Sequence, residues 1–334
     1  MTDMKRIIID CDPGNGVAGA NVDDGLALAL ALASDCIKLE LITIVAGNTP
    51  RDTGYQVACQ MLKELNKTNI PVVKGAAQAL LEPAAPWREQ LDNNVRKQGL
   101  LSLWDNLPPL SAVNDQSRPN AAQAIGELVC SNPGEITVVA IGPLTNIAHT
   151  IQLYPDFASS VAEIVIMGGV FQLDNYLKDT NFAVDPEAAK LVIESGANIT
   201  LAPLDVTTQT MLTHQDLDKL HSFANPLTDF IVRTSRPWMD YSIQTRQLAG
   251  CWIHDVLCVA KLIDESIVTS SPYIVDVSTT PDCTRASSRR WKDGALRLTV
   301  GMPVVKHKPV NVMERVDNQR LLNIIFNALS QFCC

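Results

Sequence analysis

Strand-like runs alternate with helix-like runs along most of this chain, and this alternation restricts the fold more than any other feature. Helical periodicity at residues 24–34 and 51–66, for example, separates short runs that are rich in β-branched residues. Because such strand–helix–strand units join parallel strands, we expect an α/β fold. It would be a Rossmann-like domain with a mostly parallel central sheet flanked by helices, followed by C-terminal strands and helices. The predicted strands of the sheet are residues 7–10, 38–46, 72–74, 136–141, 163–167 and 198–203.

Three stretches depart from this alternation of strands and helices. Residues 76–118 hold several prolines, which break helical periodicity, and we expect them to be irregular. Residues 211–263 are helix-like, with interruptions expected at Pro226 and Pro237. We expect one domain over residues 1–334, with 76–118 and 211–250 as flap or rim segments over a site. Beyond residue 270, the predicted elements are strands at 273–277, 296–300 and 310–313 and a closing helix at 317–331.

Charge and composition exclude several classes of protein. Of the 334 residues, 19% are charged and 46% hydrophobic, which is typical of a globular chain with a sizeable core. The net charge of −9 and the lack of a long Lys/Arg run argue against nucleic acid as a partner. The longest apolar run, residues 25–33, is too short to cross a membrane, and the N-terminus lacks the pattern of a signal peptide. Because the nine cysteines are scattered and favour reduced thiols, we expect a soluble, cytoplasmic protein without a membrane partner.

Four carboxylates lie within the first predicted strand–helix unit. Asp10 and Asp12 follow the first strand, and Asp23 and Asp24 begin the next helix. Buried together, four acids would repel one another unless a cation lay among them, and clustered oxygen ligands favour a hard ion such as Ca²⁺ or Mg²⁺. The simpler interpretation is an acidic helix N-terminus beside a solvated turn.

Polar or glycine-rich turns follow the other predicted strands as well. Asn48 comes after the second strand, residues 142–146 and 168–169 after two later ones, and Asp205 after a fifth. Because ligands of parallel sheets gather beyond the carboxyl ends of the strands, we expect one shared crevice there.

Two short motifs suggest other enzymes. Residues 14–19 are a literal G-x-G-x-x-G after a strand, which is typical of dinucleotide binding, so an NAD-dependent oxidoreductase is a lesser alternative. The four flanking acids would, however, repel a pyrophosphate. Asp10 and Asp12 also resemble the aspartate pair of haloacid-dehalogenase-type phosphatases, but Pro13 and Gly14 fit that pattern poorly.

Taken over residues 7–258, the chain resembles the nucleoside hydrolase family, the inosine–uridine-type nucleosidases. The family's opening signature, D-x-D-P-G-x-D-D, is similar to residues 10–14 followed by Asp23 and Asp24 after about seven extra residues. Further blocks follow in the family's order. They are residues 43–48, 142–148, 166–169, Asn181 with 185–189, 204–207, and His254 with Asp255.

This resemblance implies Ca²⁺-dependent hydrolysis of the N-glycosidic bond of ribonucleosides to ribose and free base. It implies that Asp12 is both a metal ligand and the general base, and that Asp24, Asp255 and the backbone carbonyl of Ile141 complete the metal site. Asp10 would orient this site from behind, and His254 would be the acid for the leaving base. The family also suggests a homodimer or homotetramer.

The resemblance implies further residues that bind the ribonucleoside substrate. Asn48 could instead be an ordinary turn residue, and Met167 and Trp252 could instead pack in the core. Asp179 stands where the family usually carries Glu, and the position of Asn175 is uncertain by a residue or two. The implied substrate-binding residues are Asp23, Asn48, Met167, Asn175, Asp179, Asn181 and Trp252.

Two departures from the family affect the functional prediction. The insertion at residues 15–22 separates the two halves of the acidic motif. If it had destroyed the geometry, the chain would be a catalytically weak nucleoside- or ribose-binding protein. A His-Gly segment that many members carry is not evident in residues 76–106, so the preference for purine or pyrimidine bases stays open.

Overall fold

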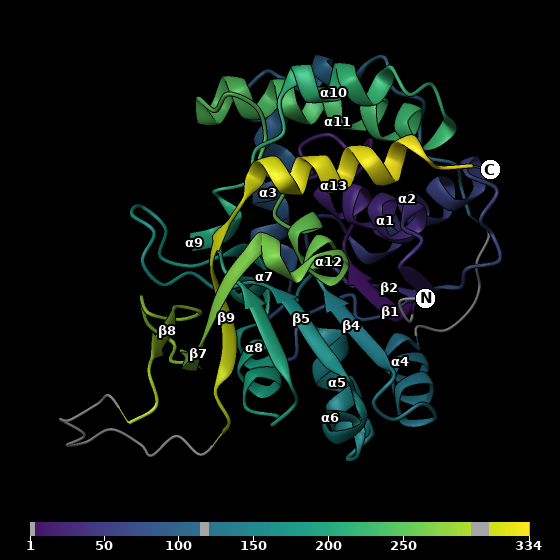
Figure 1. The fold of residues 1–334 in the computed structure, drawn as a ribbon. Coiled ribbons are helices and arrows are strands. Elements are labelled where there is room, and N and C mark those ends of the chain that lie inside the picture. Colours follow the sequence, from purple (N-terminus) through teal and green to yellow (C-terminus); the bar gives the residue numbers. More distant parts are fainter. Residues whose placement is uncertain (1–3, 114–119, 295–306, 334) are drawn as a thin grey trace.

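One large sheet organises the part of the chain that the structure describes. This computed structural model describes residues 4–113, 120–294 and 307–333 (Figure 1). Within them, nine strands form a sheet in the order β3-β2-β1-β4-β5-β6-β9-β7-β8. All neighbours from β3 to β9 in this order are parallel, and β7 and β8 at one edge are antiparallel. The strands are β1 (Lys5–Cys11), β2 (Ile37–Ile44), β3 (Val72–Lys74), β4 (Ile136–Ala140), β5 (Glu163–Met167), β6 (Ile199–Ala202), β7 (Val268–Val277), β8 (Ser288–Trp291) and β9 (Val310–Val316).

Alternate residues of each central strand pack into two separate cores. Ile7 and Ile9 of β1 belong to the core on one face of the sheet, whereas Ile8 belongs to the core on the other. This follows from the two-residue period of a strand. Because helices cover both faces, all three isoleucines are fully buried, and the expected α/β fold with a mostly parallel sheet is confirmed.

The helices form one layer on each face of the sheet. In Figure 1, α4, α5, α6 and α8 lie below the sheet, and α1, α12 and α13 lie above it with α10 and α11 outermost. The lower helices are α4 (Ala121–Cys130), α5 (Thr145–Leu153), α6 (Phe157–Ser160) and α8 (Pro186–Ile193). The upper ones are α1 (Asp23–Ala33), α2 (Arg51–Glu64), α10 (His214–His221), α11 (Pro226–Arg246), α12 (Val256–Ile263) and α13 (Asn318–Ser330). The remaining helices are α3 (Ala85–Lys97), η1 (Leu101–Trp104), α7 (Thr180–Val184), α9 (Leu204–Thr207) and η2 (Glu265–Ile267).

Two sequence predictions about proline were wrong. Residues 85–97, expected to be irregular, form the 13-residue helix α3, because Pro86 lies in its first turn, where no hydrogen bond of the helix is lost. Helix α11 continues through Pro237 for 21 residues, although Pro226 does begin it as expected. Pro237 is buried against the core, and packing of the long apolar face offsets the lost backbone hydrogen bond. The strand expected at 296–300 lies outside the described residues.

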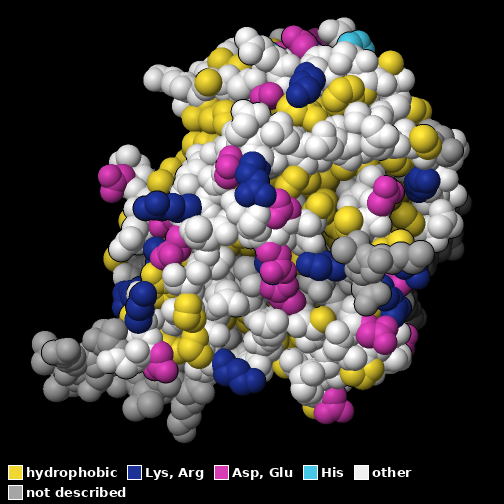
Figure 2. All heavy atoms as spheres, in the orientation of Figure 1, with side chains coloured by type: hydrophobic (Ala, Val, Ile, Leu, Met, Phe, Trp, Pro, Cys, Tyr) yellow, Lys and Arg dark blue, Asp and Glu magenta, His cyan; other side chains and the backbone are white. Residues whose placement is uncertain are grey.

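The carboxyl ends of the parallel strands meet at one edge, which is where the polar motifs lie. Backbone bonds connect the turns after neighbouring strands: Val45 N donates to Cys11 O, and Ile141 N donates to Asp10 O. On the face shown in Figure 2, Lys and Arg side chains are interspersed with Asp and Glu. None of the described helices combines the length and the apolar character needed to cross a membrane.

Candidate active site

A cavity of about 350 Å³ opens at this edge of the sheet. Its lining comes from the beginning of α1, the ends of β4 and β5, helices α3 and α11, and the segments before α7 and α12. The residues that line it are Gly19, Asn21, Asp23, Asn48, Leu91, Asn94, Ile141, Met167, Tyr176, Lys178, Asp179, Thr180, Asn181, Leu204, Trp238, Tyr241, Arg246, Trp252, His254 and Asp255.

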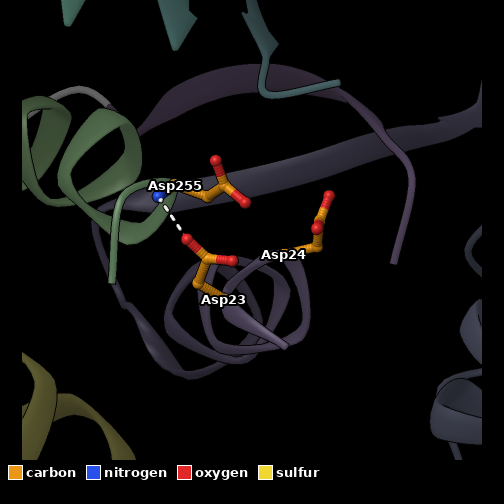
Figure 3. A group of neighbouring side chains, drawn as sticks. All are labelled: Asp23, Asp24 and Asp255. Carbon is orange, nitrogen blue, oxygen red and sulfur yellow. Dashed lines mark hydrogen bonds between the residues drawn. The ribbon is translucent and has the colours of Figure 1, made fainter. Parts of the chain in front are cut away.

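Three buried carboxylates converge beside the cavity, and two of them, Asp23 and Asp255, line it. Asp23 and Asp24 begin helix α1, and Asp255 directly precedes α12 (Figure 3). Each offers an oxygen, and these oxygens lie within 4.8 Å of one another. The backbone N–H of Asp255 also donates to Asp23 Oδ2 at 3.2 Å. Because both helices point their positive N-terminal ends at the cluster, the fold partly offsets the repulsion among the acids.

Asp12 is joined to this cluster through Asn48. The backbone N–H of Asn48 donates to Asp12 Oδ2 at 2.6 Å, and its side-chain amide lies 3.2 Å from Asp24 Oδ2. The N–H of Asp12 in turn donates to Asp24 Oδ1 at 3.0 Å. A β-carbon on Gly47 would lie 1.7 Å from Asp12 Oδ2, so only glycine leaves room for the carboxylate there.

The electrostatics of the cluster suit a bound cation. Burial raises the pKa of Asp23 to about 7, with the Asp24 carboxylate as the next cause. Burial and then neighbouring carboxylates also raise the pKa values of Asp12 and Asp255 well above the usual range. Asp23 Oδ1 is buried without a hydrogen-bond partner among the described residues. Hard oxygen donors with one unsatisfied oxygen fit a divalent cation that prefers oxygen ligands.

Asp10 lies behind these residues, on β1. Its Oδ1 accepts hydrogen bonds from the Thr43 hydroxyl at 2.5 Å and from the Asn146 amide at 2.7 Å. Burial raises its pKa to about 7, which these two bonds partly oppose. Asn146 also accepts from the N–H of Ala76, so Asp10 helps to hold three neighbouring strand ends together.

Asn181 contacts Ile141, whose carbonyl is a predicted metal ligand, and Met167, a predicted ribose contact. Its side-chain amide donates to the backbone oxygen of Ile141 at 2.8 Å and lies 3.1 Å from that of Met167. Met167 is buried, and all three residues line the cavity. The structure therefore brings these predicted residues together.

Two other predicted substrate ligands have different surroundings. Asp179 lines the cavity, but its two oxygens accept the N–H groups of Phe182 at 3.1 Å and Gly169 at 2.6 Å, which makes it the N-cap of α7. Asn175 is exposed with a left-handed φ of 68°, and it is not among the cavity-lining residues. Tyr176 nearby does line the cavity.

Aromatic rings and His254, which directly precedes Asp255 in the chain, form another part of the cavity lining. The ring of Trp252 lies 5.7 Å from that of His254 and 6.4 Å from that of Tyr176. His254 Nδ1 is 2.7 Å from the hydroxyl of Thr207. Burial, and then the charge of Arg246, lower the pKa of His254 to about 3, so its imidazole is neutral at physiological pH.

The insertion at residues 15–22 forms part of the cavity wall. The Asn15 amide donates to Thr234 of α11 at 3.0 Å, and Gly19 faces the cavity with a φ of +79°. A β-carbon on Gly19 would lie only 2.3 Å from Val95 of α3, so the two backbones approach closely. The dinucleotide hypothesis also fails here, because helix α1 begins at Asp23 rather than beside the glycines.

Sequence reasoning missed several residues of the wall. Leu91 and Asn94 of α3 line the cavity, and Asn94 donates to the Tyr241 hydroxyl at 3.1 Å. Arg88 of the same helix donates to the backbone oxygen of Gly47, and also to that of Asn48 at 3.0 Å. Leu91 and Val95, one helical turn apart after an N-terminal proline, were the available sequence signal for α3. The cavity-lining residues Lys178, Trp238 and Arg246 were also missed.

Comparisons with known proteins identify the family of this chain. The family model described as inosine-uridine preferring nucleoside hydrolase matches residues 7–323. The chain belongs to this family. Probable uridine nucleosidase 2 of Arabidopsis thaliana is 31% identical over 280 residues, which cover 83% of each chain. The pyrimidine-specific ribonucleoside hydrolase RihA of Escherichia coli is 29% identical over 343 residues, which cover 97% of each.

Solved structures give the same result. A plant nucleoside hydrolase has a TM-score of 0.83 at 26% identity, covering 98% of this chain and 99% of its own. A purine-preferring ribonucleoside hydrolase from Gardnerella vaginalis has a TM-score of 0.79 at 27% identity, covering 98% of both chains. The predicted family and enzyme class are therefore confirmed: the chain is a nucleoside hydrolase.

Proposed function

We propose that this enzyme is a Ca²⁺-dependent ribonucleoside hydrolase that releases ribose and free base. The observation that carries the proposal is one cavity lined by Asp23, Asp255 and His254, with the buried carboxylates of Asp24 and Asp12 joined to the two lining acids and aromatic rings beside His254. The carboxylate oxygens offer the ligands that Ca²⁺ prefers.

The proposed metal ligands are Asp12, Asp24, Asp255 and the Ile141 carbonyl. Ca²⁺ bound there would act as a Lewis acid that lowers the pKa of a coordinated water. Asp23, which lines the cavity whereas Asp24 does not, would face the ribose diol together with Asn48 and Asn181.

Asp12 is the proposed general base. Its position supports this role: the buried carboxylate contacts Asn48 and lies beside Asp24, where a water held by the metal would be within reach. The surrounding carboxylates would favour the positive charge that develops on the ribose as the bond breaks. His254 would donate a hydrogen bond to the departing base, with Trp252 packed beside it.

We propose pyrimidine nucleosides, uridine first, as the substrates. The names of the two sequence relatives, from Arabidopsis thaliana and Escherichia coli, refer to uridine and to pyrimidine nucleosides. The purine-preferring structural neighbour makes inosine the natural competitor to test.

A reducing-sugar assay tests the reaction. Purified enzyme would be given uridine, cytidine, inosine, adenosine and guanosine, with Ca²⁺ or with chelator. We expect ribose release that is lost with chelator and restored by Ca²⁺, with uridine turned over faster than inosine. Binding of ribose without release of any base would instead favour the catalytically weak binding protein.

We also propose a homodimer or homotetramer in the cytoplasm. The buried thiols of Cys11, Cys251 and Cys258, which form no disulfide bonds, are compatible with a reducing compartment. Light scattering of the purified enzyme would determine its oligomeric state.

A further inference from the structure

We propose that Thr207 is a positioning residue that holds His254 in the tautomer with its proton on Nε2. This inference deepens the proposed function and rests on it, because it assigns the direction in which His254 meets the leaving base. Its basis is the hydrogen bond of 2.7 Å between the Thr207 hydroxyl and His254 Nδ1.

The hydroxyl of Thr207 has no other partner among the described residues. Thr207 is fully buried in α9. If Nδ1 carried the proton and donated it to the hydroxyl, the hydroxyl's own hydrogen would be buried without an acceptor. If the hydroxyl donates to Nδ1, both groups are satisfied, and the imidazole proton must then be on Nε2.

The neighbouring threonines make other hydrogen bonds. Thr208 donates to the backbone oxygen of Leu204 at 2.7 Å, and Thr210 donates to that of Thr207 at 2.6 Å. These are common bonds of helix and turn backbone. Of the three threonines, only Thr207 directs its hydroxyl to a side chain of the cavity.

A second contact fixes the position of the Thr207 segment relative to the segment that carries His254. Thr210 Oγ1 accepts the N–H of Ile253 at 3.2 Å while donating to the backbone of Thr207. The residue beside His254 is thus tied to the segment that carries Thr207.

Nε2 is the nitrogen left for the substrate. It has no hydrogen-bond partner in the described part of the chain. His254 lines the cavity and is mostly buried, but this nitrogen is not fully enclosed. An N–H directed there becomes a stronger hydrogen-bond partner as negative charge develops on the leaving base. Thr207 would therefore act on the transition state without touching the substrate.

Kinetics of three variants test this role. Thr207→Val removes the hydroxyl at nearly constant volume, Thr207→Ser retains it, and Thr208→Val is the matched control on the next residue. For Thr207→Val we expect kcat on uridine to fall roughly tenfold or more, with KM changed less than about twofold. Turnover of p-nitrophenyl riboside, whose leaving group needs no such donor, should stay near the wild-type rate. Thr207→Ser should recover most of the uridine activity, and Thr208→Val should lose little.

Nuclear magnetic resonance tests the tautomer independently of activity. Enzyme labelled with ¹⁵N-histidine contains five histidines, and the His254 signals can be assigned by comparison with His254→Gln. We expect unprotonated Nδ1 and protonated Nε2 in the wild type, and a population with protonated Nδ1 in Thr207→Val.

Three results would overturn the inference. They are a wild-type spectrum with the proton on Nδ1, equal losses on uridine and p-nitrophenyl riboside, or full uridine activity in Thr207→Val. If the wild type released no ribose at all, the proposed function would fail, and the spectrum would still decide the tautomer. If Thr207→Val did not fold, Thr207→Ser and the wild-type spectrum would still allow the test.

Discussion

At the scale of single residues, Asp12 has the most constrained surroundings in the site. Its carboxylate is enclosed, accepts the N–H of Asn48, and fits only because Gly47 lacks a β-carbon. Such enclosure raises the pKa of a carboxyl group, because the charged form loses hydration. The ionised form of Asp12 is therefore costly to bury without a cation beside it.

Replacing Asp12 by Asn tests the general-base role. The amide keeps the shape and can still accept the Asn48 N–H, but it cannot take a proton from water. We expect kcat on uridine to fall by about a thousandfold. The melting temperature in chelator should stay equal or rise, because one buried like charge is removed. Near-normal turnover would remove the assignment.

At the scale of elements, helix α3 is the part of residues 76–113 that reaches the site. It lines the cavity, packs on the insertion at Gly19, and binds the turn of Asn48 through Arg88. The insertion and α3 therefore act together as one wall.

Replacing Arg88 by Met tests whether the hydrogen bonds from α3 position the turn that carries Asn48. The variant keeps an unbranched side chain but loses both hydrogen bonds to the backbone oxygens of Gly47 and Asn48. We expect KM for uridine to rise about three- to tenfold with a smaller change in kcat. Arg96→Met, an exposed position on the same helix, is the control. Identical KM values for the two variants would contradict this role.

Replacing Gly19 by Val tests the contact between the insertion and α3. A side chain there meets Val95 and also strains a backbone with a φ of +79°, so we expect destabilisation by about 2 kcal/mol. Limited proteolysis within residues 76–106 should become faster, and KM should rise. The double variant Gly19→Val/Val95→Ala should recover part of this effect, since it relieves the clash but not the strain. If the double variant recovered nothing, the contact would not hold α3.

At the scale of the whole molecule, the fold concentrates buried acids at one edge of the sheet. The pKa values of Asp10 and Asp23 are raised to about 7 and that of Asp179 to about 6, mainly by burial. From about pH 4 to 7, the metal-free folded state therefore binds more protons than the unfolded chain, so its free energy of unfolding falls as pH rises. The lowered pKa of His254 acts in the opposite direction below about pH 6.5, but it is one group against three.

Melting curves with and without Ca²⁺ test this balance. In chelator, we expect the melting temperature to be roughly 5 °C lower at about pH 8 than at about pH 5.5. Excess Ca²⁺ should raise it more at the higher pH, because the ion binds the ionised carboxylates. Asp23→Asn should reduce the pH dependence in chelator. A metal-free enzyme that became more stable as pH rose would contradict the expected direction of this pH dependence.

Much of the fold and the position of the acids followed from local patterns alone. Runs such as Ile7, Ile8 and Ile9 identify buried strands, and parallel strands place the residues after them at one edge. For this reason Asp23 and Asp24 were expected at this edge, whereas Asp255, more than 200 residues later in the chain, was expected there only from the resemblance to the family; the three carboxylates lie together.

The tertiary structure alone decided how that site is enclosed. Pro237 is compatible with a helix or its end, and only packing against the core selects the helix. The bonds from Arg88 to the Asn48 turn and from Thr207 to His254 join segments 40 and 47 residues apart. Local periodicity contains no information on such pairs, because their contact depends on how whole helices pack over the sheet. The sequence by itself thus determined the sheet and the chemistry at its edge, and tertiary packing determined the walls of the cavity and the orientation of its histidine.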